Sequence, residues 1–160
     1  MSVRLAKQVG KALSTRAMTL VTAESCTGGG VAQAVTRISG SSAWFDRGFV
    51  TYSNTSKEEM LGVSPHTLEE YGAVSEQVVR EMADGALQYS RAGVALSISG
   101  IAGPTGGTPQ KPVGTVWFAW ASGRTVVTAC HPLSGDRDAI RVKAVRIALQ
   151  GVIKLLNSQL

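Results

Sequence analysis

The sequence is poor in charged residues and in cysteine, and it has no long apolar run. Charged residues make up 17% of the 160 positions and hydrophobic residues 44%, a balance that excludes an intrinsically disordered chain. Two cysteines, Cys26 and Cys130, are too few for the disulfide framework of a small secreted protein. No signal peptide opens the sequence, and no apolar run reaches the roughly 20 residues that span a bilayer. We therefore expect a cytoplasmic protein with reduced thiols and no membrane partner.

The length fits one domain that spans residues 1–160, because domains commonly hold about 100–200 residues. The sequence contains no linker, repeat or low-complexity segment that would mark a boundary. The small charged fraction indicates that some surface is covered by another copy of the chain. We therefore expect a homo-oligomer, most simply a dimer.

The formal net charge of +5 favours an anionic partner. The densest basic cluster is Arg137, Arg141, Lys143 and Arg146, which falls within one expected helix. Such a cluster is most often a solvated helix face, although it can also bind nucleic acid. The sequence offers no aromatic stacking platform beside it. We therefore expect a small phosphorylated ligand rather than nucleic acid.

Hydrophobic periodicity predicts alternating helices and strands. Apolar residues three or four positions apart predict helices that include residues 5–13, 31–35, 57–61, 78–86 and 145–156. Short β-branched or apolar segments predict strands at 18–23, 44–52, 94–99, 113–121 and 125–130. Residues 53–56 are expected to form a turn, Ser75 to cap a helix, residues 122–124 to join a hairpin, and residues 134–136 to precede the last helix. This order predicts an α/β fold: three layers, α/β/α, with a mixed, mostly parallel sheet.

Ser25 follows the first expected strand, in the segment T-A-E-S-C-T-G-G-G at 22–30. A serine at a strand-to-helix turn can serve as a nucleophile, although the G-x-S-x-G pattern is absent. Free N–H groups at the start of the next helix can stabilise an oxyanion there. Alternatively, Ser25 and Thr27 only cap the helix, or Cys26 is the nucleophile, although a small buried cysteine is the more common state.

A serine nucleophile needs a base, and Lys57 is one candidate. A lysine acts as a base only when it is neutral, so burial must lower its pKa. Glu58 and Glu59 would act against that change if their carboxylates lie close. Alternatively, Lys57 is an exposed residue at a helix start. Tyr52 is either a core aromatic or a hydroxyl in a proton relay.

The two histidines leave one further possibility open. His66 and His131 lack the spacing of metal ligands, so we expect no metal. A catalytic triad of Ser25, His131 and Asp136 is compatible with the spacing, because the members of a triad need not be close in sequence.

A second glycine-rich segment, S-G-I-A-G-P-T-G-G at 99–107, can bring backbone N–H groups close to a ligand. It can equally be a surface loop, although long loops in compact domains are often functional. Its partner is expected to be the segment 134–137, because a helix N-terminus with an arginine is a natural phosphate site.

Six ordered segments together resemble the CinA C-terminal domain family. They are T-A-E-S-C-T-G-G at 22–29, G-S-S-A-W-F-D-R-G-F-V-T-Y-S-N at 40–54, G-A-V-S at 72–75, S-I-S-G-I-A-G-P-T-G-G at 97–107, K-P-V-G-T-V-W at 111–117 and S-G-D-R at 134–137. The resemblance covers nearly the whole chain and is to the stand-alone form of the family. It implies hydrolysis of nicotinamide mononucleotide to nicotinate mononucleotide and ammonia, in pyridine nucleotide recycling, without metal or cofactor.

By motif position, the resemblance implies that Ser25 is the nucleophile, Lys57 its base and Tyr52 a supporting residue. The substrate-binding residues that follow from this scheme are Cys26, Thr27, Gly28, Gly100, Gly103, Thr105, Gly106, Arg137 and Arg141. Of these, Cys26 to Gly28 would hold the oxyanion, and Arg137 or Arg141 would pair with the phosphate. Thr105 departs from the acidic residue of some relatives. The alternative is a catalytically silent, nucleotide-binding member, but the intact pair of Ser25 and Lys57 favours an enzyme.

Overall fold

The computed structural model describes residues 2–158 and contains one five-stranded sheet in the order β2-β1-β3-β4-β5. The strands are β1 (Leu20–Glu24), β2 (Phe45–Val50), β3 (Val94–Gly100), β4 (Thr115–Ser122) and β5 (Thr125–Pro132). β1 is parallel to both β2 and β3, β3 is antiparallel to β4, and β4 is antiparallel to β5. β4 alone therefore runs against the others, which confirms the mixed, mostly parallel sheet.

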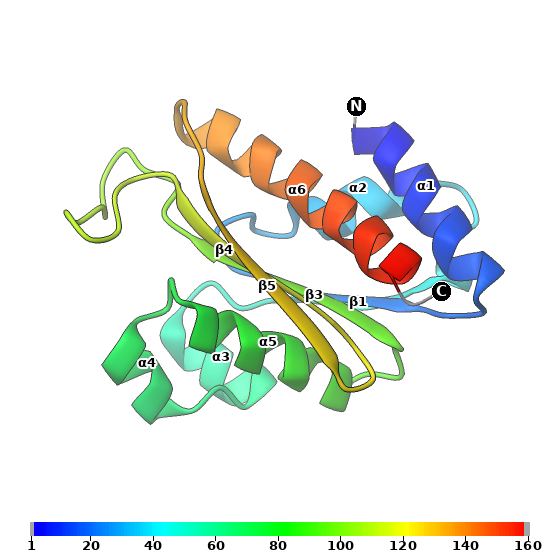
Figure 1. Cartoon of the computed structure of the whole chain (residues 1–160), viewed down its shortest axis with the longest axis horizontal. Helices are drawn as coiled ribbons and strands as arrows, with labels where there is room; N and C mark the ends of the chain where they lie inside the picture. Colours follow the sequence, from blue (N-terminus) through cyan, green and yellow to red (C-terminus); the bar gives the residue numbers. More distant parts are fainter. Residues whose placement is uncertain (1, 159–160) are drawn as a thin grey trace.

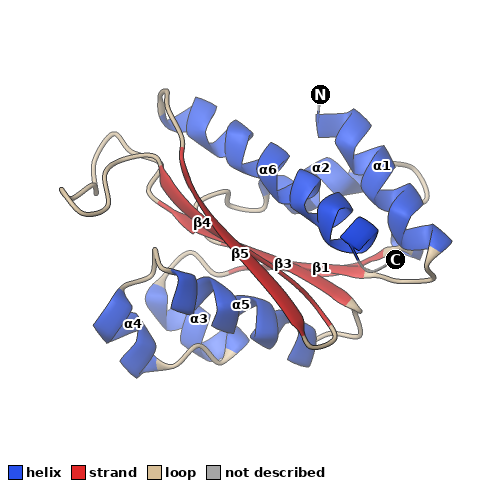
Figure 2. Cartoon of the chain, in the orientation of Figure 1, coloured by secondary structure: helices blue, strands red, loops and turns tan. Residues whose placement is uncertain are grey.

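Helices cover both faces of this sheet (Figures 1 and 2). One face carries α1 (Ser2–Thr15), α2 (Gly30–Thr36) and α6 (Arg137–Ser158), and the other carries α3 (Asn54–Leu61), α4 (Pro65–Tyr71) and α5 (Glu76–Gln88). A single 3₁₀ turn, Ser41–Ala43, precedes β2. The expected three-layer α/β/α fold is thus confirmed.

Each face of the sheet has its own apolar core. Phe118 of β4 packs with Leu13 of α1 and Leu149 of α6 on one side, and the next residue, Ala119, packs with Val79 of α5 on the other. Successive side chains of a strand point to opposite faces, so each central strand contributes to both cores. The two cores hold the helix layers, and with them the loops at the strand ends, in fixed positions.

Several helix boundaries follow from side-chain caps. The Ser75 hydroxyl accepts a hydrogen bond from Val78 N at 3.3 Å, as expected for the cap of α5. A carboxylate oxygen of Asp136 accepts one from Ala139 N at 2.9 Å at the start of α6. The prediction of a turn at residues 53–56 is wrong, because α3 already begins at Asn54. Ser53 and Ser56 form a reciprocal capping box there, with N···O distances of 3.0 and 3.2 Å.

A close backbone contact between two helices sets the position of α3. A Cβ atom built on Gly85 of α5 would lie 1.9 Å from the carbonyl oxygen of Leu61, at the end of α3. Only glycine permits this approach. Because α3 is short, its contact with α5 fixes the side chains that α3 presents to the sheet.

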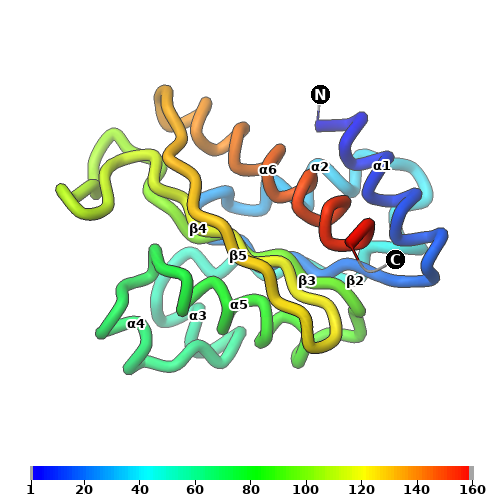
Figure 3. The backbone as a smooth tube through the Cα atoms, viewed as in Figure 1, coloured from blue at the N-terminus to red at the C-terminus, as the bar shows by residue number. Residues whose placement is uncertain are grey.

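Two further features of the fold concern its helices and its longest connecting loop. Within residues 2–158, none of the helices combines the length and the apolar character that a membrane crossing requires. The loop between β3 and β4 is long, and Figure 3 shows it projecting away from the body of the sheet.

Candidate active site

The candidate site lies where β1, β2 and β3 end. These strands are parallel, so their carboxyl ends meet at one edge of the sheet, where open α/β folds bind ligands. Ser25 directly follows β1, and its N–H donates to the Ile98 carbonyl of β3 at 3.0 Å. A pocket of about 270 Å³ opens beside it. Its lining includes Ser25, Cys26, Tyr52, Asn54, Lys57, Ala73, Val74, Arg137 and the loop residues Gly100, Gly103, Thr105 and Gly106.

Ser25 and Lys57 are in direct contact. Lys57 Nζ lies 3.0 Å from Ser25 Oγ, although the two residues are 32 positions apart. Nζ also lies 2.8 Å from the carbonyl oxygen of Thr51 and 3.5 Å from that of Tyr52. Lys57 is 1% exposed and Ser25 is 8% exposed, so the contact is largely removed from water. Sequence analysis named both residues, and the structure brings them together.

Burial lowers the pKa of Lys57 from 10.5 to about 8, because the charged ammonium loses its hydration. The one opposing cause is the nearby Cys26, which raises it. The neighbouring Glu58 and Glu59 do not contribute, contrary to the concern that their carboxylates would hold the lysine in its charged form. A neutral Lys57 is therefore accessible near physiological pH, and an amine of this kind can take a proton from a serine hydroxyl.

The loop that carries Ser25 is tied to a buried carboxylate that sequence analysis missed. Glu24 is fully buried at the end of β1, and its Oε1 accepts hydrogen bonds from Thr27 Oγ1 at 2.6 Å and from Val31 N at 2.8 Å. Its Oε2 accepts one from Ala32 N at 3.0 Å. The available signal was an acidic residue that ends an apolar strand just before a helix start. Because the Thr27 hydroxyl donates to Glu24, we expect a substrate to contact Thr27 through its backbone.

Two backbone N–H groups of this loop remain available to a ligand. Gly28 N donates to the Ser25 carbonyl at 3.0 Å, which closes a turn and occupies that N–H. The N–H groups of Cys26 and Thr27 donate to no other residue in the described part of the chain, and the Cys26 N–H also interacts with its own thiol. They are the donors that can face an oxyanion formed at Ser25.

The alternative nucleophile, Cys26, is poorly suited to that role. Its side chain is buried, and burial raises the pKa of its thiol from 9.0 to about 11. Thiol reactivity requires the thiolate, so Cys26 is unreactive near neutral pH. Ser25, in contact with an amine of lowered pKa, is the better candidate nucleophile.

Arg137 reaches across the mouth of the pocket. Its guanidinium donates to the Gly103 carbonyl at 2.7 Å and to the Tyr52 hydroxyl at 2.9 Å, which joins α6 to two loops. Tyr52 is 59% exposed, and its hydroxyl accepts from Arg137 and makes no bond to Ser25 or Lys57 among the described residues. A relay through Tyr52 is not required, because Lys57 contacts Ser25 directly.

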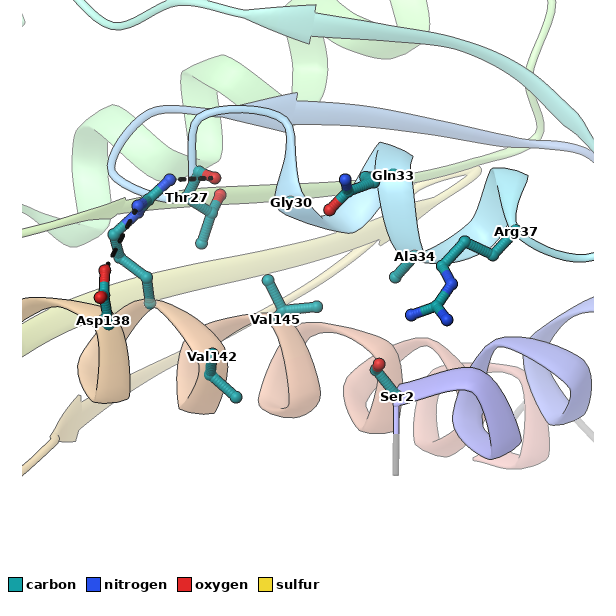
Figure 4. A pocket seen from close by; sticks show the side chains of 10 residues that line it. Ser2, Thr27, Gly30, Gln33, Ala34, Arg37, Asp138, Val142 and Val145 are labelled. Carbon is teal, nitrogen blue, oxygen red and sulfur yellow. Dashed lines mark hydrogen bonds and ion pairs between the residues drawn. The ribbon is translucent and has the colours of Figure 1, made fainter.

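Arg141 lies elsewhere, behind the Ser25 loop. Its Nε lies 3.2 Å from the carbonyl oxygen of Cys26, and a terminal nitrogen lies 3.4 Å from that of Thr27. It lines a separate cavity of about 280 Å³ between α2 and α6, shown in Figure 4. Of the two arginines that were candidates for phosphate binding, only Arg137 borders the Ser25 pocket.

The triad of Ser25, His131 and Asp136 is not formed. His131 lies on β5, with its ring 5.6 Å from that of Phe118 in an edge-on contact, and it lines a different cavity. Asp136 caps α6 through Ala139 N. Within residues 2–158, no three His, Cys, Asp or Glu side chains gather as a metal site would require.

Fold and site together define an α/β protein with a buried serine–lysine pair at the carboxyl end of its first strand. The chain belongs to the CinA C-terminal domain family, whose model matches residues 2–156.

Three similar proteins place the chain more narrowly within the family. It is 60% identical to nicotinamide-nucleotide amidohydrolase PncC of Escherichia coli K12, over 92% of this chain and 90% of that protein. It is 49% identical to the protein of the same name from Pseudomonas putida, over 94% of each chain. The crystal structure of a CinA superfamily protein from Klebsiella pneumoniae superposes with a TM-score of 0.95 and 40% identity, over 99% of both chains.

Proposed function

We propose that this protein is a nicotinamide-nucleotide amidohydrolase, which converts nicotinamide mononucleotide to nicotinate mononucleotide and ammonia in pyridine nucleotide recycling. The observation that carries this proposal is the 3.0 Å contact between Lys57 Nζ and Ser25 Oγ in a buried site. The names of relatives up to 60% identical over most of their length support the same reaction and substrate.

The contacts of Lys57 favour its action as a base. A neutral amine has two N–H donors and one lone pair. The carbonyls of Thr51 and Tyr52 accept from the two N–H groups, which leaves the lone pair directed at the third neighbour, Ser25 Oγ. In this orientation the serine hydroxyl is the donor and its proton passes directly to Nζ.

The reaction then proceeds in two stages. As Lys57 takes the proton, Ser25 Oγ forms a bond to the carboxamide carbon, and the N–H groups of Cys26 and Thr27 stabilise the oxyanion. The C–N bond breaks, and ammonia leaves with the proton that Lys57 returns. Water next attacks the acyl-enzyme ester with Lys57 as base, which releases the carboxylate product and restores Ser25.

The shape of the pocket supports a nucleotide substrate. Ala73, Val74 and Ile101 offer apolar surface for the pyridine ring near Ser25. Arg137 stands at the opening, where its guanidinium can exchange a neutral acceptor for a phosphate. We assign the phosphate to Arg137 and place ribose against the loop at 100–106.

The test is ammonia release from nicotinamide mononucleotide, with no added metal, by wild type, Ser25→Ala and Lys57→Met. We expect each substitution to lower kcat at least about 10³-fold, because a nucleophile and its base act as a unit. Lys7→Met removes an exposed lysine of α1 and serves as the control with unchanged turnover. Full turnover by Ser25→Ala refutes the mechanism. A folded wild type without turnover refutes the proposed activity.

Nicotinamide riboside, which lacks the phosphate, tests the assignment of Arg137. Arg137→Met is expected to raise KM for the mononucleotide about tenfold or more, because a charge-assisted contact is lost. KM for the riboside should stay within about twofold, since the riboside cannot make that contact. Equal increases for both substrates would contradict the assignment.

We further propose that the enzyme works in the cytoplasm as a homo-oligomer. Both cysteines, Cys26 and Cys130, are free thiols, as a reducing compartment would keep them. Val127 on the edge strand β5 is 46% exposed and borders an apolar groove that another copy of the chain could cover. Sedimentation of the purified protein measures the oligomeric state directly.

A further inference from the structure

Arg141 is a half-buried cation that the proposed mechanism does not use. Its side chain is 39% exposed and reaches from α6 to the back of the Ser25 loop, on the side away from the substrate pocket. There it contacts two successive backbone carbonyls, those of Cys26 and Thr27. Its ion pair with the exposed Asp138 is long at 4.0 Å. The contacts with the loop are thus its principal interactions.

Each of these carbonyls belongs to a peptide group whose N–H serves the site. The Cys26 carbonyl shares its peptide group with Thr27 N–H, one of the two free donors beside Ser25. The Thr27 carbonyl shares its peptide group with Gly28 N–H, which closes the turn on the Ser25 carbonyl. A cation that bonds to a carbonyl oxygen polarises the whole peptide group and makes its N–H a stronger donor.

We propose that Arg141 is a positioning residue of the amidase: by bonding the Cys26 and Thr27 carbonyls, it strengthens the oxyanion donor Thr27 N–H and fixes the turn that holds Ser25. The proposal rests on the proposed function. It assigns to Arg141 a role on the far side of the loop, distinct from the phosphate contact that sequence analysis allowed. The guanidinium also lies near Gly28, where an added Cβ would be in ordinary van der Waals contact with it at 3.4 Å.

The role predicts a specific kinetic signature. Arg141→Met keeps the length of the side chain but removes its charge and donors. We expect kcat to fall about tenfold, less than the 10²–10³-fold of a deleted oxyanion donor, because Thr27 N–H remains in place. KM should stay within about twofold, since substrate does not touch Arg141. Arg141→Lys keeps the charge but not the two-point contact, so its kcat should lie between those of wild type and Arg141→Met.

The cavity beside Arg141 allows the missing group to be restored. Figure 4 shows this cavity, which Gln33, Arg37 and Val145 also line. In Arg141→Ala it should admit a free guanidinium ion, and we expect guanidinium well below denaturing concentrations to raise kcat several-fold. The control is Arg37→Met, which removes the same charge from the same cavity; among the described residues, the Arg37 side chain makes no hydrogen bond to the loop. It should keep kcat within about twofold and show no rescue.

Thermal melting of each variant checks that it is folded, and Arg141→Lys provides the test if Arg141→Ala does not fold. An aryl boronic acid, which forms a tetrahedral adduct with an active serine, separates failure of this proposal from failure of the proposed function. If wild type releases no ammonia from the mononucleotide, weaker adduct formation in Arg141→Met still supports the role of Arg141. Unchanged kcat and boronate affinity in Arg141→Met, or a rise in KM alone, would overturn it.

Discussion

The lowered pKa of Lys57 predicts how turnover depends on pH. Lys57 acts as a base only in its neutral form, and burial lowers its pKa from 10.5 to about 8. The rate kcat/KM on nicotinamide mononucleotide should therefore rise about tenfold per pH unit at low pH and level off above about pH 8. We call this rising part of the pH–rate profile the limb. Because kcat/KM refers to the free enzyme, the limb reports the pKa of Lys57 in the empty pocket.

The size of the effect follows from the two pKa values. At pH 7, a lysine with a pKa of about 8 is neutral in about one molecule in ten, whereas one with a pKa of 10.5 is neutral in about one in three thousand. Burial thus raises the reactive population about 300-fold. The thiol of Cys26, with its pKa raised to about 11, stays protonated over this range and does not add a second limb.

One isosteric substitution should move this limb without altering either member of the pair. Asn54 is exposed at the first position of α3 and lines the same pocket as Lys57. Asn54→Asp adds a carboxylate there, which favours the charged ammonium and should shift the limb upward by about half a unit. Asn54→Ser adds no charge and is the matched control.

The assay is ammonia release at low substrate concentration between about pH 6 and pH 10, with melting temperatures measured at each pH. A limb centred near pH 8 in wild type and displaced upward in Asn54→Asp would support the reasoning. A kcat/KM that still rises about tenfold per pH unit up to pH 10 would show that Lys57 is not desolvated in solution. A flat profile across this range would refute its role as the base.

Three further predictions concern stability. Lys57→Met should stabilise the fold by up to about 3 kcal/mol below pH 8, because the folded-state pKa is depressed and the charged lysine is penalised there. This gain should disappear between pH 8 and 10.5, and a lower urea midpoint in the variant at pH 7 would contradict it. Glu24→Gln places an amide N–H donor next to backbone N–H groups that the carboxylate now accepts from. It should lower the free energy of unfolding in urea by about 2 kcal/mol and also lower kcat. Unchanged values of both would count against the bonds described. Gly85→Ala places a Cβ 1.9 Å from Leu61 O and should lower the free energy of unfolding by about 1–3 kcal/mol. The control is Gly123→Ala, which has no neighbour within 4 Å and tests the turn conformation alone. Equal losses of stability in the two variants would refute the packing argument.

The fold was accessible from the sequence because its signals are local. Val9 and Leu13 of α1, or Leu149 and Leu156 of α6, recur at helical spacing, and the strands are short and apolar. The missed start of α3 was also encoded locally. Ser53 and Ser56 have the three-residue separation of a capping box, but a run of polar residues resembles a turn as closely as a capped helix.

The site was accessible only in part, because its pairings are not local. Ser25 stood out by its place after a strand, but its proposed base lies 32 positions further on, and residue types alone allowed Lys57 or His131. The family resemblance, rather than the residues, distinguished them. Arg137 and Arg141 were also equivalent in sequence, since they lie one helical turn apart. The structure is needed to show that Arg137 extends from α6 to the pocket, whereas Arg141 extends to the back of the Ser25 loop.

The burial that would suit Lys57 to act as a base carries a sequence signal, which becomes clear once α3 is known to begin at Asn54. The buried residues of this helix are Lys57 and Leu61, four positions apart, so the lysine occupies a place on the inward stripe where an apolar residue is expected. A lysine is rarely buried without an acidic partner. Here its neighbours are a hydroxyl and two backbone carbonyls, none of which can neutralise its charge. A fold that holds a lysine in this way loses stability and gains a neutral amine, so a lysine on the apolar stripe of a short helix is itself an indication of a catalytic base.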